Sequence, residues 1–493
     1  MKKIVYLPLD ERPCNMGYSA AVSEGHSAYR LVSPELDEMG VKKTPAAYPE
    51  IKAFLERECR DADRLVIALD TLLYGGIIPS RLHHLDKDEL LGRLEVLKTV
   101  KENNPKLHVS AFSLVMRCPC YSDSSEEPDY YAVCGREIFL YGQNEHKLRL
   151  GEISREEYEK EREALAPCLP YIEDYEARRA VNIDCLTDAL KMVGSYIDEF
   201  TILQDDSNAR GYTAMDRERV LAVVRERGID LDTYPGADEA GLTLLARAAT
   251  GIENRRPRIY PKYPRAGACD VVPIYEDREI KKTVSAQIKS AGAIECASED
   301  EADLVLYCNL NDERTYDVYL NYAKQSDEGY MGAFAEDIAK TLESGRGAAV
   351  ADVAYCNSGD ITLVTEMEKR FDLLSLWGYA GWNTASNTLG TVICQGLLRY
   401  LYGDSATHRR FTALRIIDDT VYSADVRREM LRLGYGAGGA QIPTRGEASE
   451  FIVRRINERT RELFPSIGEK YEAIDCYLPW HRLFEIGLKI KEK

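Results

Sequence analysis

Residues 65–72, LVIALDTL, place five apolar residues directly before an aspartate. This run lacks the alternation of a half-exposed strand, so it predicts a parallel strand that is covered on both faces. The same pattern, a short apolar run before a helical segment, recurs at residues 4–10, 30–34, 109–116, 201–205 and 232–236. Parallel strands joined by helical crossovers follow from this order, so the sequence predicts an α/β fold.

Composition divides the chain further. Residues 121–199 are rich in Glu, Arg and Tyr, which predicts a helical insertion or lid within an α/β catalytic region of residues 1–252. The polar, proline-containing stretch 253–258 predicts a boundary. Beyond it we expect a second α/β region, residues 253–400, that completes the site, and a mainly helical region, residues 401–493. The strands expected in the second region are 270–274, 303–309, 348–354 and 373–379, and its helices are 280–290 and 333–342.

Two architectures fit this order. One is a (β/α)8-like barrel with a helical insertion and a helical C-terminal region, and it is the preferred prediction. The other is a pair of packed, doubly wound α/β domains with a cleft between them. The number of expected strands exceeds that of a plain barrel, so some runs are false or a second sheet exists.

Charge and hydropathy exclude several classes of protein. The 493 residues carry a net charge of −18, and such an acidic field repels the phosphate backbone of nucleic acids. No apolar stretch approaches the roughly 18 to 20 residues that cross a bilayer, so we expect no membrane partner. The apolar run before Asp10 is too short for a signal-peptide core, which predicts a cytoplasmic protein.

The cysteines and histidines give no sign of a metal centre. Thirteen cysteines, an odd and scattered number, suit a reducing compartment, where most of them would be buried. Cys118 and Cys120 lack both the usual spacing and a second pair for a zinc site. Histidines are spread out, with His83 and His84 the only neighbours. The sequence therefore predicts no metal site and carries no phosphate-binding loop or nucleophile elbow.

Polar clusters follow one expected strand after another, and in parallel α/β folds that edge holds the active site. A single carboxylate there usually caps a helix or pairs with an arginine, but repetition at six strand ends favours a site. The candidates are Asp10, Glu11, Arg12, Asp70, Arg81, Asp205, Asp206, Asp238, Glu239, Asn357, Asp360, Trp382 and Asn383.

Asp205 and Asp206 form the most informative cluster. Two adjacent acids after a buried strand can have separated pKa values, one charged and the other protonated, which suits acid/base catalysis. Together with Asp70 and Glu239 they could instead offer oxygen ligands to Mg²⁺ or Ca²⁺. Trp382 and Asn383 combine an aromatic face with an amide, a pairing that matches a sugar ring.

Several motifs together resemble an uncharacterised bacterial family known as a domain of unknown function. They are LPLDERPCN (residues 7–15), DTLLYGG (70–76), IPSR (78–81), QDDS (204–207), PGADE (235–239) and YAGWNTASNTLG (379–390). The resemblance covers essentially the whole chain but implies no reaction. A further similarity is to barrel β-N-acetylhexosaminidases, which implies an aspartate-pair role for Asp205 and Asp206 and a later asparagine-containing segment at residues 381–383. Spacing and flanking residues depart from that family.

We therefore expect a carbohydrate-active enzyme, a glycoside hydrolase acting on a small glycoside such as an N-acetylhexosaminide. Asp206 would be the general acid/base, Asp205 would orient the substrate or stabilise positive charge, and Asp70 or Glu239 would be a second carboxylate. The other candidates would bind the substrate, with no cofactor. A metal-dependent hydrolase or lyase using Mg²⁺ or Mn²⁺, and a non-catalytic binder of a small polar ligand, are the alternatives. The 31 tyrosines suit either a homodimer surface or cores and pockets.

Overall fold

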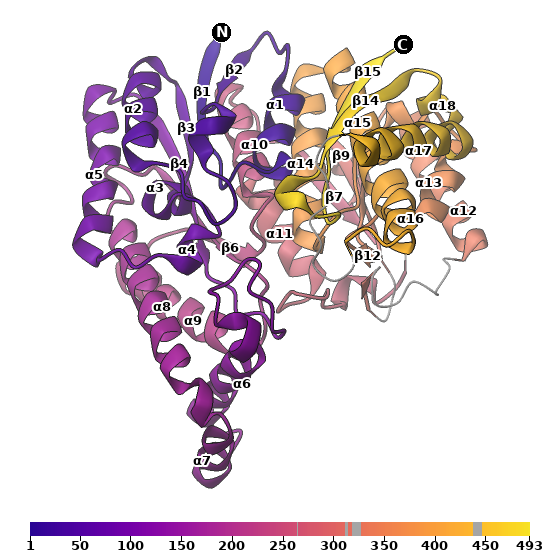
Figure 1. The fold of residues 1–493 in the computed structure, drawn as a ribbon. Helices are drawn as coiled ribbons and strands as arrows, with labels where there is room; N and C mark the ends of the chain where they lie inside the picture. Colours follow the sequence, from indigo (N-terminus) through magenta and orange to yellow (C-terminus); the bar gives the residue numbers. More distant parts are fainter. Residues whose placement is uncertain (264, 311–313, 318–326, 437–445) are drawn as a thin grey trace. The chain divides into compact units, whose positions relative to one another are not determined.

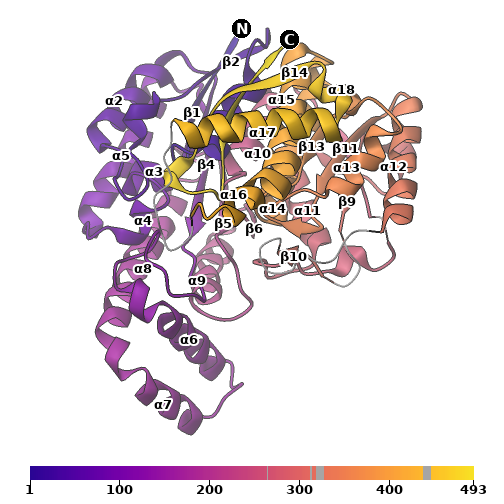
Figure 2. The same cartoon turned by 45° about the vertical axis from the view of Figure 1, so that its right-hand side comes forward.

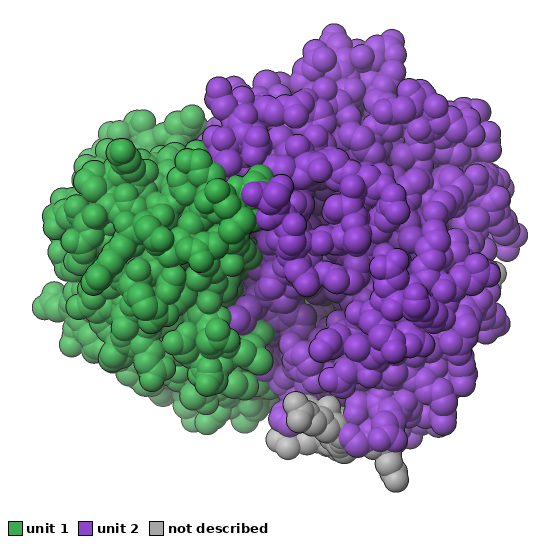
Figure 3. All heavy atoms as spheres, turned by 90° about the horizontal axis from the view of Figure 1, so that it is seen from above, with its two compact units in different colours: residues 1–11, 28–241, 275–277 green, residues 12–27, 242–274, 278–493 purple. Residues whose placement is uncertain are grey.

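The computed structural model describes residues 1–263, 265–310, 314–317, 327–436 and 446–493. The chain divides into two compact units, which Figure 3 shows in different colours. Unit 1 consists of residues 1–11, 28–241 and 275–277, and unit 2 consists of residues 12–27, 242–274 and 278–493.

Unit 1 contains a six-stranded parallel sheet in the order β2-β1-β3-β4-β5-β6. Its strands are β1 (Lys2–Leu7), β2 (Tyr29–Val32), β3 (Arg64–Ala68), β4 (His108–Val115), β5 (Glu199–Gln204) and β6 (Asp232–Pro235). The central strand β3 pairs with β1 from Ile4 opposite Arg64 and with β4 from Arg64 opposite His108. Four of its five residues are buried, as expected for a strand covered on both faces.

Helices connect these strands. They are α2 (Tyr48–Glu58), α3 (Leu69–Tyr74), α4 (Pro79–Leu82), α5 (Lys87–Asn103), α6 (Tyr131–Arg149), α7 (Arg155–Ala164), α8 (Leu169–Leu190) and α9 (Tyr212–Arg227). Three of them, α6 to α8, fill the connection between β4 and β5 and project from the sheet as an arm with α7 at its tip (Figures 1 and 2). The helical character predicted for residues 121–199 is thus present.

Unit 2 contains a five-stranded parallel sheet in the order β13-β11-β9-β7-β8. Its strands are β7 (Arg258–Lys262), β8 (Ile294–Glu295), β9 (Leu304–Asn309), β11 (Gly347–Asp352) and β13 (Gly378–Ala380). Numbered along the chain within each unit, both sheets start 2-1-3-4-5, the order of a doubly wound fold in which ligands bind beyond the carboxyl ends of the strands. Two short strands, β10 (Tyr316–Asp317) and β12 (Tyr355–Cys356), pair separately.

Helices cover both faces of this second sheet. Val305 and Tyr307 of β9 belong to one apolar cluster with Phe334 of α12. On the opposite face, a Cβ at Gly396 of α14 would lie 2.5 Å from the Leu304 side chain, so glycine allows this close approach. The helices are α1 (Tyr18–Ser23), α10 (Ala240–Ile252, which starts in unit 1), α11 (Ile280–Ser290), α12 (Glu328–Glu343), α13 (Ile361–Glu368), α14 (Ala385–Tyr402), α15 (Ala406–Ile416), α16 (Arg427–Arg432), α17 (Glu447–Leu463) and α18 (Pro465–Gly468).

Two features complete unit 2. A π-helical segment, η8 (Ile417–Val426), joins α15 to α16, and an antiparallel pair, β14 (Tyr471–Tyr477) and β15 (Gly487–Glu492), ends the chain. The pair adds strands to the predicted mainly helical region 401–493. Across the described part of the chain, no helix has both the length and the apolar character needed to cross a membrane.

The parallel α/β class predicted from the sequence is confirmed. Among the described strands, pairing ends at β2 and β6 in one sheet and at β13 and β8 in the other. A closed (β/α)8-like barrel is therefore not shown, and the alternative of two doubly wound α/β units fits this topology. More strands were expected than a plain barrel contains because the chain forms this second sheet.

Individual strand predictions in unit 2 differ in outcome. Residues 303–309 and 348–354 contain β9 and most of β11. The prediction at 270–274 is wrong, because the segment follows a short 3-10 turn, contains Pro273, which has no N–H to donate, and leaves Val272 exposed. The sequence analysis missed β7, which has polar ends, a proline and only one fully buried apolar residue, Ile259.

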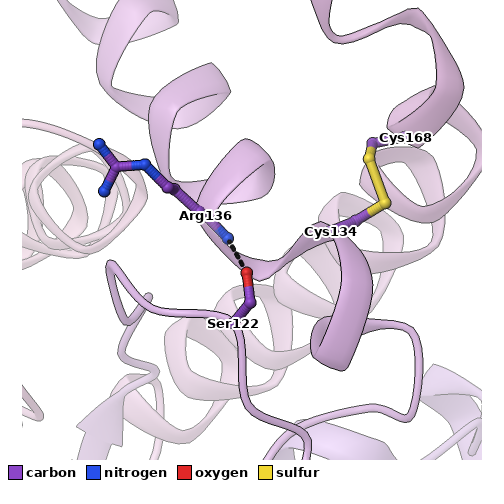
Figure 4. Close-up of a disulfide and its surroundings, with 4 residues drawn as sticks. All are labelled: Ser122, Cys134, Arg136 and Cys168. Carbon is purple, nitrogen blue, oxygen red and sulfur yellow. Dashed lines mark hydrogen bonds between the residues drawn. A yellow bond between two sulfur atoms is a disulfide. The ribbon is translucent and has the colours of Figure 1, made fainter.

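A disulfide joins Cys134 of α6 to Cys168, which lies in a 3-10 turn directly before α8 (Figure 4). Both cysteines belong to the apolar cluster of the arm, with Tyr131 and Tyr175 among its members. The scattered, odd number of cysteines gave no sign of this pairing, and a disulfide is unusual in the reducing compartment that they suggested. Of the remaining cysteines that the structure describes, most are buried, as predicted.

Replacing both Cys134 and Cys168 by serine is expected to lower the free energy of unfolding by about 3 to 4 kcal/mol, because the bond closes a loop of 34 residues and restricts the unfolded chain. Urea unfolding followed by circular dichroism, with and without dithiothreitol, measures this difference. Cys120→Ser, at an exposed free cysteine, is the control. Equal midpoints for the double variant and the control, or a wild type insensitive to reductant, contradict this prediction.

Candidate active site

The connections that follow the strands of unit 1 bring charged side chains together. Asp70 follows β3 at the start of α3, Arg81 lies in α4, and Asp205 and Asp206 follow β5 directly. Arg117, two residues after β4, joins them. All these positions follow the carboxyl ends of parallel strands, the edge at which doubly wound folds bind their ligands.

Arg81 is the centre of this cluster. Its side chain is only 2 % exposed, and one terminal nitrogen donates to Asp205 at 2.6 Å. The other terminal nitrogen lies 3.2 Å from Glu127 and 3.4 Å from Glu126. A buried guanidinium therefore neutralises carboxylates that could not stay charged alone in this environment.

Arg117 binds the same two glutamates from a second direction. Its Nε lies 2.8 Å from Glu127 and one terminal nitrogen lies 3.0 Å from Glu126, while the other terminal nitrogen lies 3.1 Å from Asp206. The two arginines thus share the glutamates, and each also holds one aspartate of the pair. Four carboxylates face two guanidiniums, an excess of negative charge that favours a proton on one of the acids.

Among these acids, Asp206 has a raised pKa. Burial, together with the charge of the neighbouring Asp205, raises the pKa of Asp206 to about 6, although the Arg117 guanidinium lowers it. Its side chain remains 26 % exposed, more than twice the 12 % of Asp205. A carboxyl group that keeps its proton up to about pH 6 and is reachable from solvent can donate that proton to a substrate.

The backbone of Asp206 has φ = 39°, in the left-handed region that non-glycine residues rarely occupy. The sequence analysis offered helix capping as its ordinary role, but α9 begins at Tyr212 with Gly211 as its N-cap. Such conformations cost about 1 to 3 kcal/mol and concentrate at functional sites.

Two buried polar atoms beside the aspartate pair have no hydrogen-bond partner among the described residues: Nε2 of Gln204 and Oγ of Ser207. Gln204 uses only its oxygen, which accepts from Arg217 at 3.0 Å. Buried donors without partners are rare in folded proteins, and a bound ligand is one way to satisfy them. Hydrogen-bonding capacity therefore remains on both sides of the pair.

Asp70 is more enclosed than the pair. One of its oxygens accepts from the Ser113 hydroxyl and from the Leu114 N–H, both at 3.0 Å. Burial raises the pKa of Asp70 to about 6, and the charge of Asp205 adds to this effect. Through these two hydrogen bonds, Asp70 links the end of β3 to β4.

Glu239 is completely buried at the start of α10. Its Oε2 accepts from the Ala237 N–H at 3.0 Å, and burial raises the pKa of Glu239 to about 8. Gly236 makes this arrangement possible, because its φ is 142° and a Cβ there would lie 1.9 Å from Oε1 of Glu239. The carboxyl group is thus held in protonated form against the backbone of the loop after β6.

Glu239→Gln should flatten the pH dependence of stability. The folded-state pKa of about 8 lies above the unfolded value, so the stabilising contribution is complete below about pH 4.5 and is lost as the pH rises to about 8. Over this window the free energy of unfolding of the wild type should fall by roughly 1.4 kcal/mol per pH unit because of Glu239. The variant, which lacks the titrating group, should not show this fall. Urea unfolding between pH 5 and 8 measures this, with the exposed Glu226→Gln as control. Parallel curves for wild type and Glu239→Gln would refute it.

The other predicted substrate-binding residues of unit 1 are Asp10, Glu11 and Asp238. Asp10 and Asp238 are buried, and Glu11 accepts the Lys42 N–H at 3.1 Å. In unit 2, Arg12 lies over the Trp480 ring at 4.6 Å and lies 3.5 Å from Glu485.

Asp360 and Trp382 of unit 2 have local structural partners. Asp360 is the N-cap of α13 and accepts the N–H groups of Thr362 and Leu363, the ordinary role considered for such acids. The Trp382 indole N–H donates to Thr391 at 3.1 Å, and its ring meets Tyr18 edge-on. Both side chains thus also serve the fold of unit 2.

Asn357 and Asn383 have φ values of 67° and 48°, and the N–H of the first donates to the carbonyl of the second at 2.8 Å. With Trp382, they line a cavity of about 20 Å³, the volume of a single water molecule. Arg415 lies over the Tyr18 ring there at 4.0 Å. In this conformation, the cavity that these three predicted residues line has no room for a sugar ring.

The sequence analysis missed several charged residues. Arg117, Glu126 and Glu127 are not among the residues predicted from the sequence, although Arg117 directly precedes Cys118. An arginine directly after a buried strand was the available signal.

Among the described residues, no group of three or more His, Cys, Asp or Glu side chains is placed to hold a metal ion.

One family model, described as "Protein of unknown function (DUF4127)", matches residues 4–489. This match over nearly the whole chain confirms the prediction of a domain-of-unknown-function family. No curated protein matches the sequence. The similarity to barrel β-N-acetylhexosaminidases stays a prediction.

Proposed function

We propose that this chain, which belongs to the DUF4127 family of proteins of unknown function, is a glycoside hydrolase whose acid catalyst is Asp206 in unit 1. The observation that carries the proposal is that the adjacent Asp205 and Asp206 have different surroundings. Arg81 holds Asp205 at 2.6 Å, whereas Asp206 is the more exposed and has a pKa of about 6. A carboxyl group that can donate a proton, beside one that is paired with an arginine, is an arrangement that acid-catalysed cleavage of a glycosidic bond can use.

In this mechanism Asp206 donates its proton to the oxygen of the leaving group as the bond breaks. Asp205 stabilises the positive charge that develops on the sugar ring, and a water molecule then bonds to the anomeric carbon and returns a proton to the Asp206 carboxylate. Arg117 keeps Asp206 in place through its 3.1 Å contact. The unpartnered atoms of Gln204 and Ser207 offer hydrogen bonds to substrate hydroxyl groups.

Asp70 and Glu239, the predicted alternatives for a second carboxylate, receive supporting roles in this proposal. Asp70 is buried and its bonded oxygen accepts two hydrogen bonds from β4, and Glu239 is completely buried against its own loop. Neither carboxyl group reaches a substrate without a rearrangement of its loop.

A screen of the purified protein against aryl glycosides, including N-acetylhexosaminides, with and without EDTA, tests the proposal. We expect turnover that EDTA does not reduce, with kcat/KM falling above about pH 6 as Asp206 loses its proton. Turnover abolished by EDTA would favour the alternative of a Mg²⁺- or Mn²⁺-dependent hydrolase or lyase. Absence of turnover on every glycoside would count against a glycosidase and favour a non-catalytic binder.

A further inference from the structure

Unit 1 contains a cavity of about 690 Å³ that none of the residues assigned to acid catalysis lines. Its walls come from residues 43–49, which lead into α2, and from the segment that runs from the end of α3 to the second turn of α5. Both segments follow the carboxyl ends of strands, β2 in one case and β3 in the other. Its volume is typical of sites that enclose a small organic molecule.

Aromatic rings form one part of this cavity. Tyr74 and His83 are stacked, with ring centroids 4.6 Å apart and an interplanar angle of 22°. The guanidinium of Arg93 lies over the Tyr48 ring at 5.1 Å. All four residues line the cavity, which suits a flat aromatic ligand.

The orientation of His83 shows that its ring serves as a surface. One ring nitrogen lies 2.7 Å from Oδ1 of Asn182, and the other accepts the Leu85 N–H at 3.2 Å. Asn182 is itself fixed, because its Nδ2 donates to the Ser80 carbonyl at 2.9 Å. Because both ring nitrogens already have partners, the neutral imidazole has no polar atom left for a ligand. It can offer a ligand only the face of a ring whose orientation is fixed by these hydrogen bonds and by stacking on Tyr74.

The charged residues of the cavity are mainly cationic. Arg93 donates to Glu89 at 2.6 Å and to the Leu73 carbonyl, but its Nε is buried without a hydrogen-bond partner. Lys43 adds a second cation, more than a third exposed and 3.1 Å from the exposed Asp129.

We propose that this cavity is a second binding site of unit 1, for a small planar aromatic carboxylate. The ring of the ligand packs against the aromatic side chains, and its carboxylate binds the guanidinium of Arg93 and is attracted by Lys43. The site is independent of the proposed glycosidase chemistry, so each can fail without the other.

Titration of the full chain with 2-naphthoate and with its neutral analogue 2-naphthamide, followed by ligand-observed NMR, tests this site. We expect 2-naphthoate to bind about tenfold more tightly, since a hydrogen bond to a charged group is worth roughly 1.5 to 3 kcal/mol. Arg93→Gln should weaken naphthoate binding about tenfold and change naphthamide binding less than about twofold. Arg57→Gln, on α2 outside the cavity, should change neither.

Two further variants keep the test decisive. If Arg93→Gln does not fold, Lys43→Gln, at an exposed ion pair, should still weaken naphthoate binding about threefold. Asp206→Asn should leave naphthoate binding unchanged, which separates this site from the proposed catalytic one. Equal affinities for the two probes, no binding of either, or naphthoate affinity that is insensitive to both Arg93→Gln and Lys43→Gln would overturn the proposal.

Discussion

Arg81→Met should lower the free energy of unfolding by about 3 to 5 kcal/mol, the usual cost of leaving buried carboxylates without their cation. Arg81 is 2 % exposed and contacts Asp205, Glu126 and Glu127, so three acids lose a partner at once. Urea unfolding at pH 7 measures the loss. Because protonation of the orphaned acids relieves it, the difference between wild type and variant should shrink as the pH is lowered towards 4.

Arg149→Met is the matched control, because Arg149 forms an exposed ion pair with Glu145 at 3.2 Å within α6. Such surface pairs contribute less than about 1 kcal/mol. If Arg81→Met costs no more than this control, the buried network does not hold the loops of unit 1 together, and the account of the site loses its structural basis.

Asp206→Asn should lower kcat/KM by about 100-fold or more on a glycoside that the wild type cleaves, since a general acid contributes 10² to 10⁴ in rate. Asparagine can still accept from Arg117, so the fold should survive, as a thermal unfolding scan would show. The fall in kcat/KM above about pH 6 should also disappear.

Asp300→Asn, at a carboxylate that is 96 % exposed, should leave kcat/KM unchanged. A loss below tenfold in Asp206→Asn, or a wild-type pH profile that persists in it, would remove Asp206 from the catalytic role.

Much of the fold could be predicted because buried parallel strands have a visible signature. Residues 65–68 and 304–309 are apolar or buried on both faces and lie in β3 and β9, whereas residues 69–72 of the predicted strand begin α3. The order of the strands could not be predicted, since nothing within a run identifies its neighbour. Residues 4 and 5 of β1, for example, pair with both β2 and β3. A strand such as β7, which buries only Ile259 fully, carries no such signature.

Some residues of the candidate site could likewise be predicted from the sequence, and others could not. Asp205, Asp206 and Arg81 were predicted, because polar residues at strand ends are recognisable locally. Glu127 was not, because its contacts with Arg81 span 46 residues and depend on how the loop before α6 folds back. Asp360 illustrates the converse, since the same local pattern also describes the helix cap that it forms.

The most direct test of Asp206 as the general acid compares two leaving groups. Protonation matters for a poor leaving group such as phenol and little for a good one such as 2,4-dinitrophenol. Asp206→Asn should therefore lose about 100-fold or more in kcat/KM on the phenyl glycoside and less than about tenfold on the 2,4-dinitrophenyl glycoside. Equal losses on both substrates would contradict the assignment of Asp206 as the acid.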